Sequence, residues 1–233
     1  MNLAPDGPMA IPMWVNGHAY LTVTESFFDV IDAQTGDAVR RVPLCGAAEA
    51  AEAANAAQAA QPAWAALTAA ERQAHLSALA DALAGYAGHF AKLVRQETGK
   101  SEADAGAEVE AAVAALRGSS AGEPGVVAVL ADASRPLAAT AELAASALAS
   151  GATVVVKPSP KASSAVFALC ELSARAGWPA GVLNLLQGDE AAIDGLCASP
   201  SIGRVAYAGD AALGQKIGAI AARHGKSFSA REA

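Results

Sequence analysis

The cysteine and histidine side chains are the first candidates for chemistry in this sequence of 233 residues. Nucleophilic catalysis or metal binding would need such residues at short, regular spacings. The sequence contains no CxxC or HExxH motif, and its cysteines and histidines are scattered: Cys45, Cys170, Cys197, His18, His75, His89 and His224. We therefore expect no metal site, and we interpret the cysteines as small buried side chains in a reducing cytoplasm. A nucleophilic role for Cys170 or Cys197 is the alternative, although both fall at apolar positions of predicted helices.

A lysine and two glycines form a second group of candidates, because each follows a predicted strand. Lys157, Gly188 and Gly209 come after short apolar runs, and parallel sheets bind their ligands at the carboxyl ends of strands. The sequence lacks GxGxxG, so this motif does not identify a dinucleotide site. Lys157 can equally be a solvated lysine at a strand end, and Gly188 can equally be a turn glycine.

The second half of the sequence supplies the elements that would position these residues. Apolar runs rich in β-branched residues alternate with helical segments. The runs are 126–130, 153–156, 182–186 and 204–207, and the helices are 136–148, 163–175, 190–198 and 211–223. Strands alternating with helices of this length predict a parallel sheet that is covered on both faces. With right-handed crossovers, the fold class is α/β, a doubly wound parallel sheet of Rossmann type.

The first half predicts a short β-hairpin followed by a helical region. Asn16-Gly17 is a strong hairpin dipeptide within 14–20, and two more strands, 26–31 and 38–44, flank a turn at 34–37. The predicted helices are 47–60, 68–86, 89–98 and 102–117. Pro62 should interrupt the first helix, a Thr68–Glu71 capping box should open the second, and Gly99 should end the third.

Composition changes at the linker 118–122, which is rich in glycine and serine. We therefore divide the chain into 1–118, the hairpin and helical region, and 119–233, the dinucleotide-binding type of domain. We expect the two regions to pack as one compact unit.

Charge and hydropathy exclude several classes of partner. The net charge is −7 and no basic stripe is present, so we expect no nucleic-acid partner. No apolar run reaches the roughly 20 residues that a membrane-spanning helix needs. The N-terminus lacks the pattern of a signal peptide, and we expect a cytoplasmic protein.

Several segments resemble the aldehyde dehydrogenase superfamily, in matching order along nearly the whole chain. The segments are 28–43 (FDVIDAQTGDAVRRVP), 97–100 (ETGK), 152–159 (ATVVVKPS), 177–188 (GWPAGVLNLLQG) and 205–209 (VAYAG). The resemblance implies the N-terminal helical region and the NAD(P)-binding domain of that family.

The catalytic residues that the resemblance implies have no match in this sequence. Arg231 occupies the position of the family's glutamate base, and Ser134 replaces the asparagine of its oxyanion hole. None of the three cysteines lies where the family's nucleophile would be. Loss of one oxyanion donor commonly costs about 100- to 1,000-fold in rate. We therefore assign no catalytic residue.

The cofactor residues that the resemblance implies are partly altered. Lys157 and Ser159 match the family's ribose-binding stretch, whereas Pro160 replaces its glutamate. Gly188 matches a glycine that lets the adenine approach, and Gly209 lies in the turn before the pyrophosphate. Asp210 replaces a serine there, which suits a helix N-cap but repels a phosphate. We thus expect that no cofactor binds in the conventional way, or that NAD or NADP binds weakly.

These departures favour a catalytically incomplete pseudoenzyme. It would serve as an interaction, regulatory or structural subunit for a partner enzyme of aldehyde or acyl metabolism, such as a full-length dehydrogenase, or would form an altered homo-oligomer. The alternative is the NAD(P)-binding subunit of a split aldehyde dehydrogenase, with an intact βα framework and Lys157. A third hypothesis is that the chain is a fragment of a longer enzyme. The changes at Ser134, Pro160 and Asp210 disfavour it, because a working enzyme would keep the family's residues at these positions.

Overall fold

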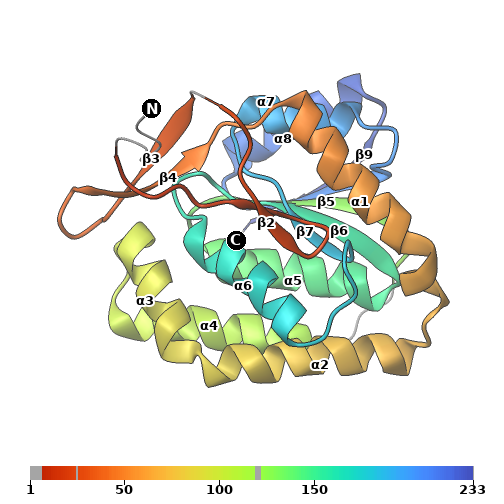
Figure 1. The fold of residues 1–233 in the computed structure, drawn as a ribbon, viewed down its shortest axis with the longest axis horizontal. Coiled ribbons are helices and arrows are strands. Elements are labelled where there is room, and N and C mark those ends of the chain that lie inside the picture. The colour runs from red at the N-terminus through yellow and green to blue at the C-terminus, as the bar shows by residue number, and fades with distance from the viewer. Residues whose placement is uncertain (1–6, 25, 119–121, 233) are drawn as a thin grey trace, which may run out of the picture.

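The fold is a sheet that lies between two layers of helices (Figure 1). The computed structural model describes residues 7–24, 26–118 and 122–232. The parallel part of the sheet consists of five strands: β5 (Gly125–Ala131), β6 (Ala152–Lys157), β7 (Leu183–Leu185), β8 (Arg204–Ala208) and β9 (Ser227–Arg231). The helices between them are α5 (Pro136–Ala149), α6 (Ser164–Arg175), α7 (Glu190–Ala198) and α8 (Ala211–Arg223).

The strand order confirms the doubly wound topology. The seven-stranded sheet has the order β2-β1-β7-β6-β5-β8-β9, in which β5 pairs in parallel with both β6 and β8. The chain therefore winds outward from β5 to β7, crosses back, and continues from β8 to β9. The topological switch point lies between β5 and β8, which is the place where open α/β sheets bind ligands.

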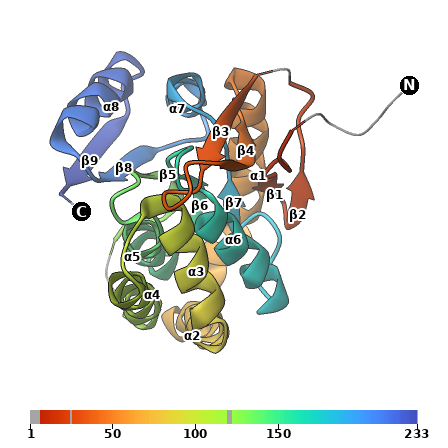
Figure 2. The same ribbon diagram turned by 90° about the vertical axis from the view of Figure 1, so that its left-hand side faces the viewer.

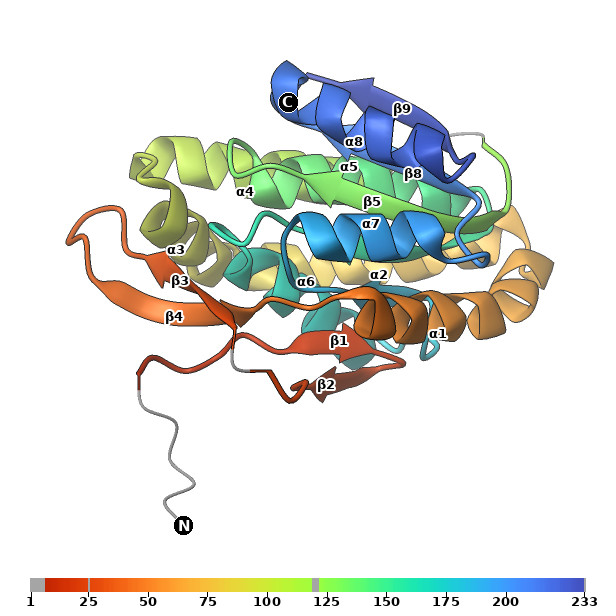
Figure 3. The ribbon, with the colours of Figure 1, turned by 90° about the horizontal axis from the view of Figure 1, so that it is seen from above.

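Alternate side chains of the central strands face different helical layers. Val127 and Val129 of β5 belong to one apolar cluster, whereas Val126, Ala128 and Leu130 belong to another. Helices α1 (Ala47–Ala66), α7 and α8 cover one face, and Figure 3 shows this face toward the viewer. The other face carries α5 and α6, with three more helices beyond them: α2 (Ala69–Gly85), α3 (Ala87–Thr98) and α4 (Glu102–Arg117). Burial of all six residues of β6 explains its valine-rich sequence.

The N-terminal hairpin extends this sheet at one edge. Strands β1 (Met13–Val15) and β2 (His18–Tyr20) pair antiparallel, and Trp14 of β1 pairs with Leu185 of β7. Asn16 and Gly17 have φ angles of 52° and 79°, as an Asn-Gly hairpin turn requires. Figure 2 shows this hairpin on one side of the molecule and β9 on the other.

Strands β3 (Phe27–Ile31) and β4 (Ala38–Pro43) form a separate two-stranded sheet. Val30 and Val42 pack with Ile11 and Phe167 of α6. The three strand segments expected before residue 45 are therefore present, with the first divided into β1 and β2.

The helix predicted to stop before Pro62 is longer than expected. Helix α1 continues through Pro62 to Ala66, so the expected interruption was wrong. Pro62 is exposed, whereas Trp64 beyond it is buried and donates a hydrogen bond from Nε1 to the Leu148 oxygen at 3.0 Å. This tertiary anchor compensates the one helix hydrogen bond that proline cannot make.

The predicted start of α2 and the predicted end of α3 are confirmed. Thr68 and Glu71 form the expected capping box, and Gly99 ends α3 with a φ of 73°. The expected linker 118–122 falls partly on 119–121, outside the described residues. Among the described residues, none of the helices could span a lipid bilayer. The division at residue 118 stays a prediction.

Candidate functional site

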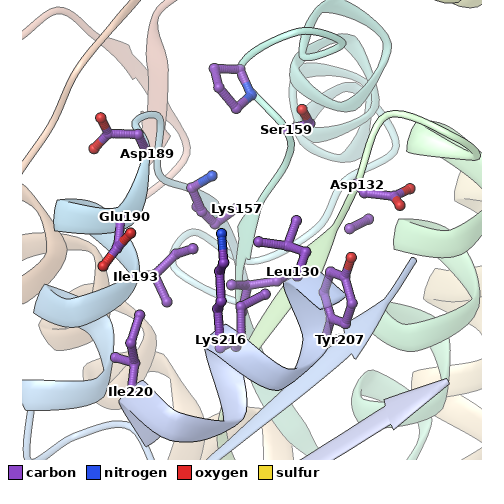
Figure 4. Close-up of a pocket in the computed structure, with 14 residues that line it drawn as sticks. Leu130, Asp132, Lys157, Ser159, Asp189, Glu190, Ile193, Tyr207, Lys216 and Ile220 are labelled. Atoms are coloured by element: carbon purple, nitrogen blue, oxygen red, sulfur yellow. The ribbon is translucent and has the colours of Figure 1, made fainter. Parts of the chain in front are cut away.

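A cavity of about 190 Å³ lies at the carboxyl ends of the central strands, between α7 and α8. Figure 4 shows Asp189, Glu190 and Ile193 on one side of it and Asp132 and Tyr207 on the other. Its apolar wall comes from Leu130, Ile193, Leu213, Ile217 and Ile220. Its charged side chains are Asp132, Lys157, Asp189, Glu190 and Lys216. The cavity thus combines apolar surface with both signs of charge, at the place where the topology predicts a ligand.

Lys157 is the last residue of β6 and is 5% exposed. Its Nζ donates a hydrogen bond to the Pro158 oxygen at 3.0 Å. Burial lowers the pKa of Lys157 to about 8, and the nearby Asp189 carboxylate opposes this shift. The interpretation as a solvated surface lysine was therefore wrong, because the side chain at this strand end is buried.

Ser159 lies in that turn and also lines the cavity. Its Oγ accepts a hydrogen bond from the Lys161 N–H at 3.3 Å, which shapes the turn. The structure therefore brings Lys157 and Ser159 together, with Pro160 beside them in the same wall.

Asp210 caps α8, as the sequence predicted. Its Oδ1 accepts a hydrogen bond from the Leu213 N–H at 2.9 Å. Its own N–H donates to Oδ2 of Asp132 at 2.7 Å. Two backbone donors at the start of α8 are therefore taken by carboxylates of this chain.

Asp132 is a site residue that the sequence analysis missed. It directly follows β5, and parallel pairing of Ala131 with Ala208 places it beside the start of α8. Ser134 donates to Oδ1 of Asp132 from its backbone N–H at 2.8 Å and also from its hydroxyl. The sequence showed only an acidic residue at a predicted strand end. The pairing of β5 with β8 is what places this residue beside the start of α8.

Gly209 permits this close approach. Its φ is +149°, and a Cβ atom there would collide with the Asp132 carboxyl and the Tyr207 hydroxyl. The Tyr207 hydroxyl donates a hydrogen bond to the backbone carbonyl oxygen of Asp210 at 3.2 Å. Burial, and then the charges of Asp132 and Asp210, raise the pKa of Tyr207. The turn at Gly209 therefore lies in direct contact with the carboxylates of Asp132 and Asp210.

Gly188 lies against Cys45, which precedes α1, and against Ala192 of α7, and it is not among the residues that line the cavity. Its φ is +121°, and a Cβ would come within 3.0 Å of the Cys45 backbone and 2.9 Å of the Ala192 Cβ. Of the sequence-predicted residues, the structure thus brings Lys157 and Ser159 into the cavity wall, while Gly209 and Asp210 form the adjoining turn.

The three cysteines do not form a reactive centre. All are buried and free, and burial is the main cause that raises their pKa values, for Cys45 to about 12. A thiol of this kind is poorly nucleophilic at neutral pH. This disfavours a catalytic role for Cys170 or Cys197.

The cavity fits only part of the dinucleotide that the resemblance implies. Its apolar wall suits a flat ring, and the Lys157 amine has donors for hydroxyl groups. The start of α8, where a pyrophosphate would bind, presents the carboxylates of Asp132 and Asp210 instead. The residues present therefore do not fit a dinucleotide bound with its pyrophosphate at α8.

Comparison with known proteins gives consistent relatives. Residues 20–123 and 120–231 match the model of the aldehyde dehydrogenase family. Malonate-semialdehyde dehydrogenase of Pseudomonas aeruginosa is 32% identical over 225 residues, which cover 87% of this chain and 45% of that protein. Succinate-semialdehyde dehydrogenase [NADP(+)] of Escherichia coli is 31% identical, over 81% of this chain and 44% of that protein.

Solved structures agree with the fold. An NADP-dependent enzyme of Escherichia coli superposes with a TM-score of 0.89 at 28% identity, covering 96% of this chain and 52% of that one. Lactaldehyde dehydrogenase of Escherichia coli gives 0.90 at 26% identity, covering 97% and 52%.

The chain spans about half the length of the relatives it matches. Since NADP stands in the names of two of them, the comparisons give no support to the expectation that no cofactor binds. The family match extends over both halves of the described fold, from the last residue of β2 to the end of β9. The chain belongs to the aldehyde dehydrogenase family.

Proposed function

We propose that this chain is a catalytically incomplete member of its family that acts as an interaction or structural subunit for a partner enzyme of aldehyde or acyl metabolism. The observation that carries the proposal is the pair of carboxylates at the start of α8. Asp132 and Asp210 take the N–H groups of Asp210 and Leu213, at 2.7 and 2.9 Å. Backbone N–H groups at a helix start are the donors that bind phosphate.

Electrostatics strengthens this argument. A phosphate placed about 4 Å from one carboxylate would pay up to about 4 kcal/mol at an effective dielectric constant of 20. Solvent reduces this cost at Asp210, which is exposed, and less at Asp132, which is half-buried. We therefore expect a dinucleotide to bind this pocket weakly, or with its phosphates elsewhere.

The oxyanion position of the family is altered in the same way. Ser134 takes that position by resemblance, and its N–H and hydroxyl both donate to Asp132. These donors are thus directed at a carboxylate of the chain rather than at a substrate. This arrangement supports a scaffold whose polar groups satisfy each other.

Both edges of the sheet leave room for a partner chain. All three residues of β2 are exposed, and four of the five residues of β9 are exposed. Exposed strand edges have unpaired backbone groups and tend to find partners. The three free, buried cysteines suit the cytoplasm, where we place the complex.

The second candidate function is the NAD(P)-binding subunit of a split dehydrogenase. It is favoured by one observation, the apolar cavity with a buried Lys157 amine at the carboxyl ends of β5, β6 and β8. The two candidates differ in whether a dinucleotide binds this cavity with appreciable affinity.

Calorimetric titration with NAD and NADP separates them. We expect no heat at millimolar cofactor for the unchanged chain, and weak binding to appear in an Asp132→Ala/Asp210→Ser variant, which removes both carboxylate charges from the helix start. Micromolar affinity of the unchanged chain would overturn the proposal and leave the second candidate. The subunit role is tested by sedimentation of the chain mixed with full-length aldehyde dehydrogenases of its host, and a monomer with every one of them would contradict that role.

A further inference from the structure

The Lys157 amine has the surroundings of a reactive lysine rather than of a structural one. It is 5% exposed, and among the described residues its Nζ has no salt-bridge partner within 4.0 Å. The one hydrogen bond of Nζ in this part of the chain goes to the adjacent Pro158 oxygen. An ammonium group has three donors, so two of them remain for a ligand in the cavity.

The cavity around this amine is suited to a small, mainly apolar molecule. Its wall includes Leu130, Ile193 and Ile220, and the Asp189 and Glu190 carboxylates stand at its side (Figure 4). Burial lowers the pKa of Lys157 to about 8, so roughly a tenth of the amine is neutral at pH 7. A desolvated lysine of this kind is an activated nucleophile toward carbonyl groups.

We propose that Lys157 is a covalent capture site for short aliphatic aldehydes, which condense with its amine inside the cavity between α7 and α8. The aldehyde carbon faces Nζ, and its alkyl chain contacts the apolar wall.

The step balances without an oxidant, a reductant or a further reactant. The nitrogen lone pair of neutral Lys157 adds to the carbonyl carbon, forming a C–N bond and a carbinolamine. The C–O bond then breaks, and a C=N bond forms. The carbonyl oxygen leaves as water with the two protons that the amine gave up. The carboxylates of Asp189 and Glu190 line the same cavity and can relay these protons.

Lys216 provides a comparison within the same cavity. It also lines the cavity, but it lies on an exposed face of α8. Its side chain is therefore open to solvent, whereas that of Lys157 is buried. An aldehyde that merely labels accessible lysines would prefer Lys216 over Lys157.

This inference rests on the proposed function, because a dinucleotide in the cavity would cover Lys157. Different results would contradict the proposed function and this inference. Protection of Lys157 by millimolar NAD or NADP would count against the proposed function. Absence of preferential modification of Lys157 without any cofactor would count against this inference.

The test is reductive trapping of the purified full chain. Butanal and sodium cyanoborohydride are added at pH 7, and peptide mapping by mass spectrometry quantifies the butyl adduct on each of the six lysines. We expect at least about tenfold more adduct on Lys157 than on Lys216. An equal or lower yield on Lys157 would overturn the inference.

Two variants make the assignment specific. Lys157→Gln should remove the dominant adduct, and Lys92→Gln, which changes an exposed lysine outside the cavity lining, should leave the yield on Lys157 unchanged. Because the decisive ratio is measured on the unchanged chain, the result does not depend on how well either variant folds. A longer probe, decanal, should label Lys157 less than butanal if the cavity selects for size, and equal labelling by both would argue against capture inside the cavity.

Discussion

Asp132 accepts a hydrogen bond on Oδ2 from the backbone N–H of Asp210, at 2.7 Å. This contact joins the end of β5 to the start of α8 across the point where the winding of the sheet reverses. Its consequence is that a helix start suited to an external anion binds two carboxylates of the same chain. The stability and the ligand preference of this turn therefore depend on the same side chains.

Asp210→Ser should leave stability nearly unchanged, because serine and aspartate are comparable N-caps. We expect the free energy of unfolding to change by less than about 0.5 kcal/mol, whereas Asp210→Ala should lose about 1 kcal/mol. Urea denaturation followed by circular dichroism measures both. Equal losses in the two variants would show that the 2.9 Å bond to the Leu213 N–H contributes little.

Gly209→Ala should destabilise the fold more than an ordinary glycine substitution. The new Cβ would collide with the Asp132 carboxyl and the Tyr207 hydroxyl, and alanine is also strained at a φ of +149°. We expect a loss of about 2–4 kcal/mol.

Gly36→Ala is the matched control for this substitution. Gly36 has a φ of +78°, but a Cβ there would meet no atom within 4 Å. Its substitution should cost only the backbone strain, about 1 kcal/mol. Similar losses for the two variants in urea denaturation would contradict the importance of the collision at Asp132.

Much of the fold could be predicted because its signals are local. Thr68 with Glu71 opens α2, and Gly99 ends α3, since caps depend only on neighbouring residues. The prediction at Pro62 was wrong because the contact that stabilises the continued helix is tertiary. Trp64, beyond Pro62, is buried and donates a hydrogen bond to Leu148, 84 residues away.

The site was less predictable than the fold for the same reason. Lys157 and Asp210 stand out at ends of elements, where a local pattern is informative. Asp132 gains its role only through the pairing of β5 with β8, strands that are distant in the sequence. The burial of Lys157 likewise depends on tertiary packing around the end of β6, which no local pattern encodes.

Glu108 should be important for stability although it lies outside the cavity. It is 5% exposed, and its Oε1 accepts hydrogen bonds from the N–H groups of Leu137 and Ala138 at 2.9 and 3.3 Å. Its other oxygen pairs with Lys100. Glu108→Ala leaves these buried donors and the lysine charge without a partner, so we expect a loss of about 3 kcal/mol.

Asp81→Ala is the comparison on the surface. Asp81 pairs with Arg117 at 2.8 Å, and the two side chains are 70% and 53% exposed. Exposed ion pairs contribute little, so we expect a change below about 0.5 kcal/mol. Thermal or urea unfolding of both variants tests the contrast, and a small loss for Glu108→Ala would mean that α5 finds another cap.

Lys157 should make stability rise with pH in alkaline solution. Its pKa is about 8 in the fold and 10.5 ordinarily, so between these values the unfolded chain holds a proton that the folded chain has released. Stability increases with pH wherever the unfolded state binds more protons. Below pH 8 the buried charge costs up to about 3 kcal/mol, and this cost disappears as the pH rises to about 10.5.

Lys157→Met removes this charge and fills the same space with an apolar side chain. We expect the variant to be more stable than the unchanged chain by up to about 3 kcal/mol at pH 7, with the difference shrinking steadily between pH 8 and 10.5. Urea denaturation at a series of pH values measures both proteins. Cys45, whose pKa burial raises to about 12, lowers stability above pH 9 in both, so its contribution cancels in the difference. A difference that does not vary with pH would show that Lys157 keeps its ordinary protonation in the fold.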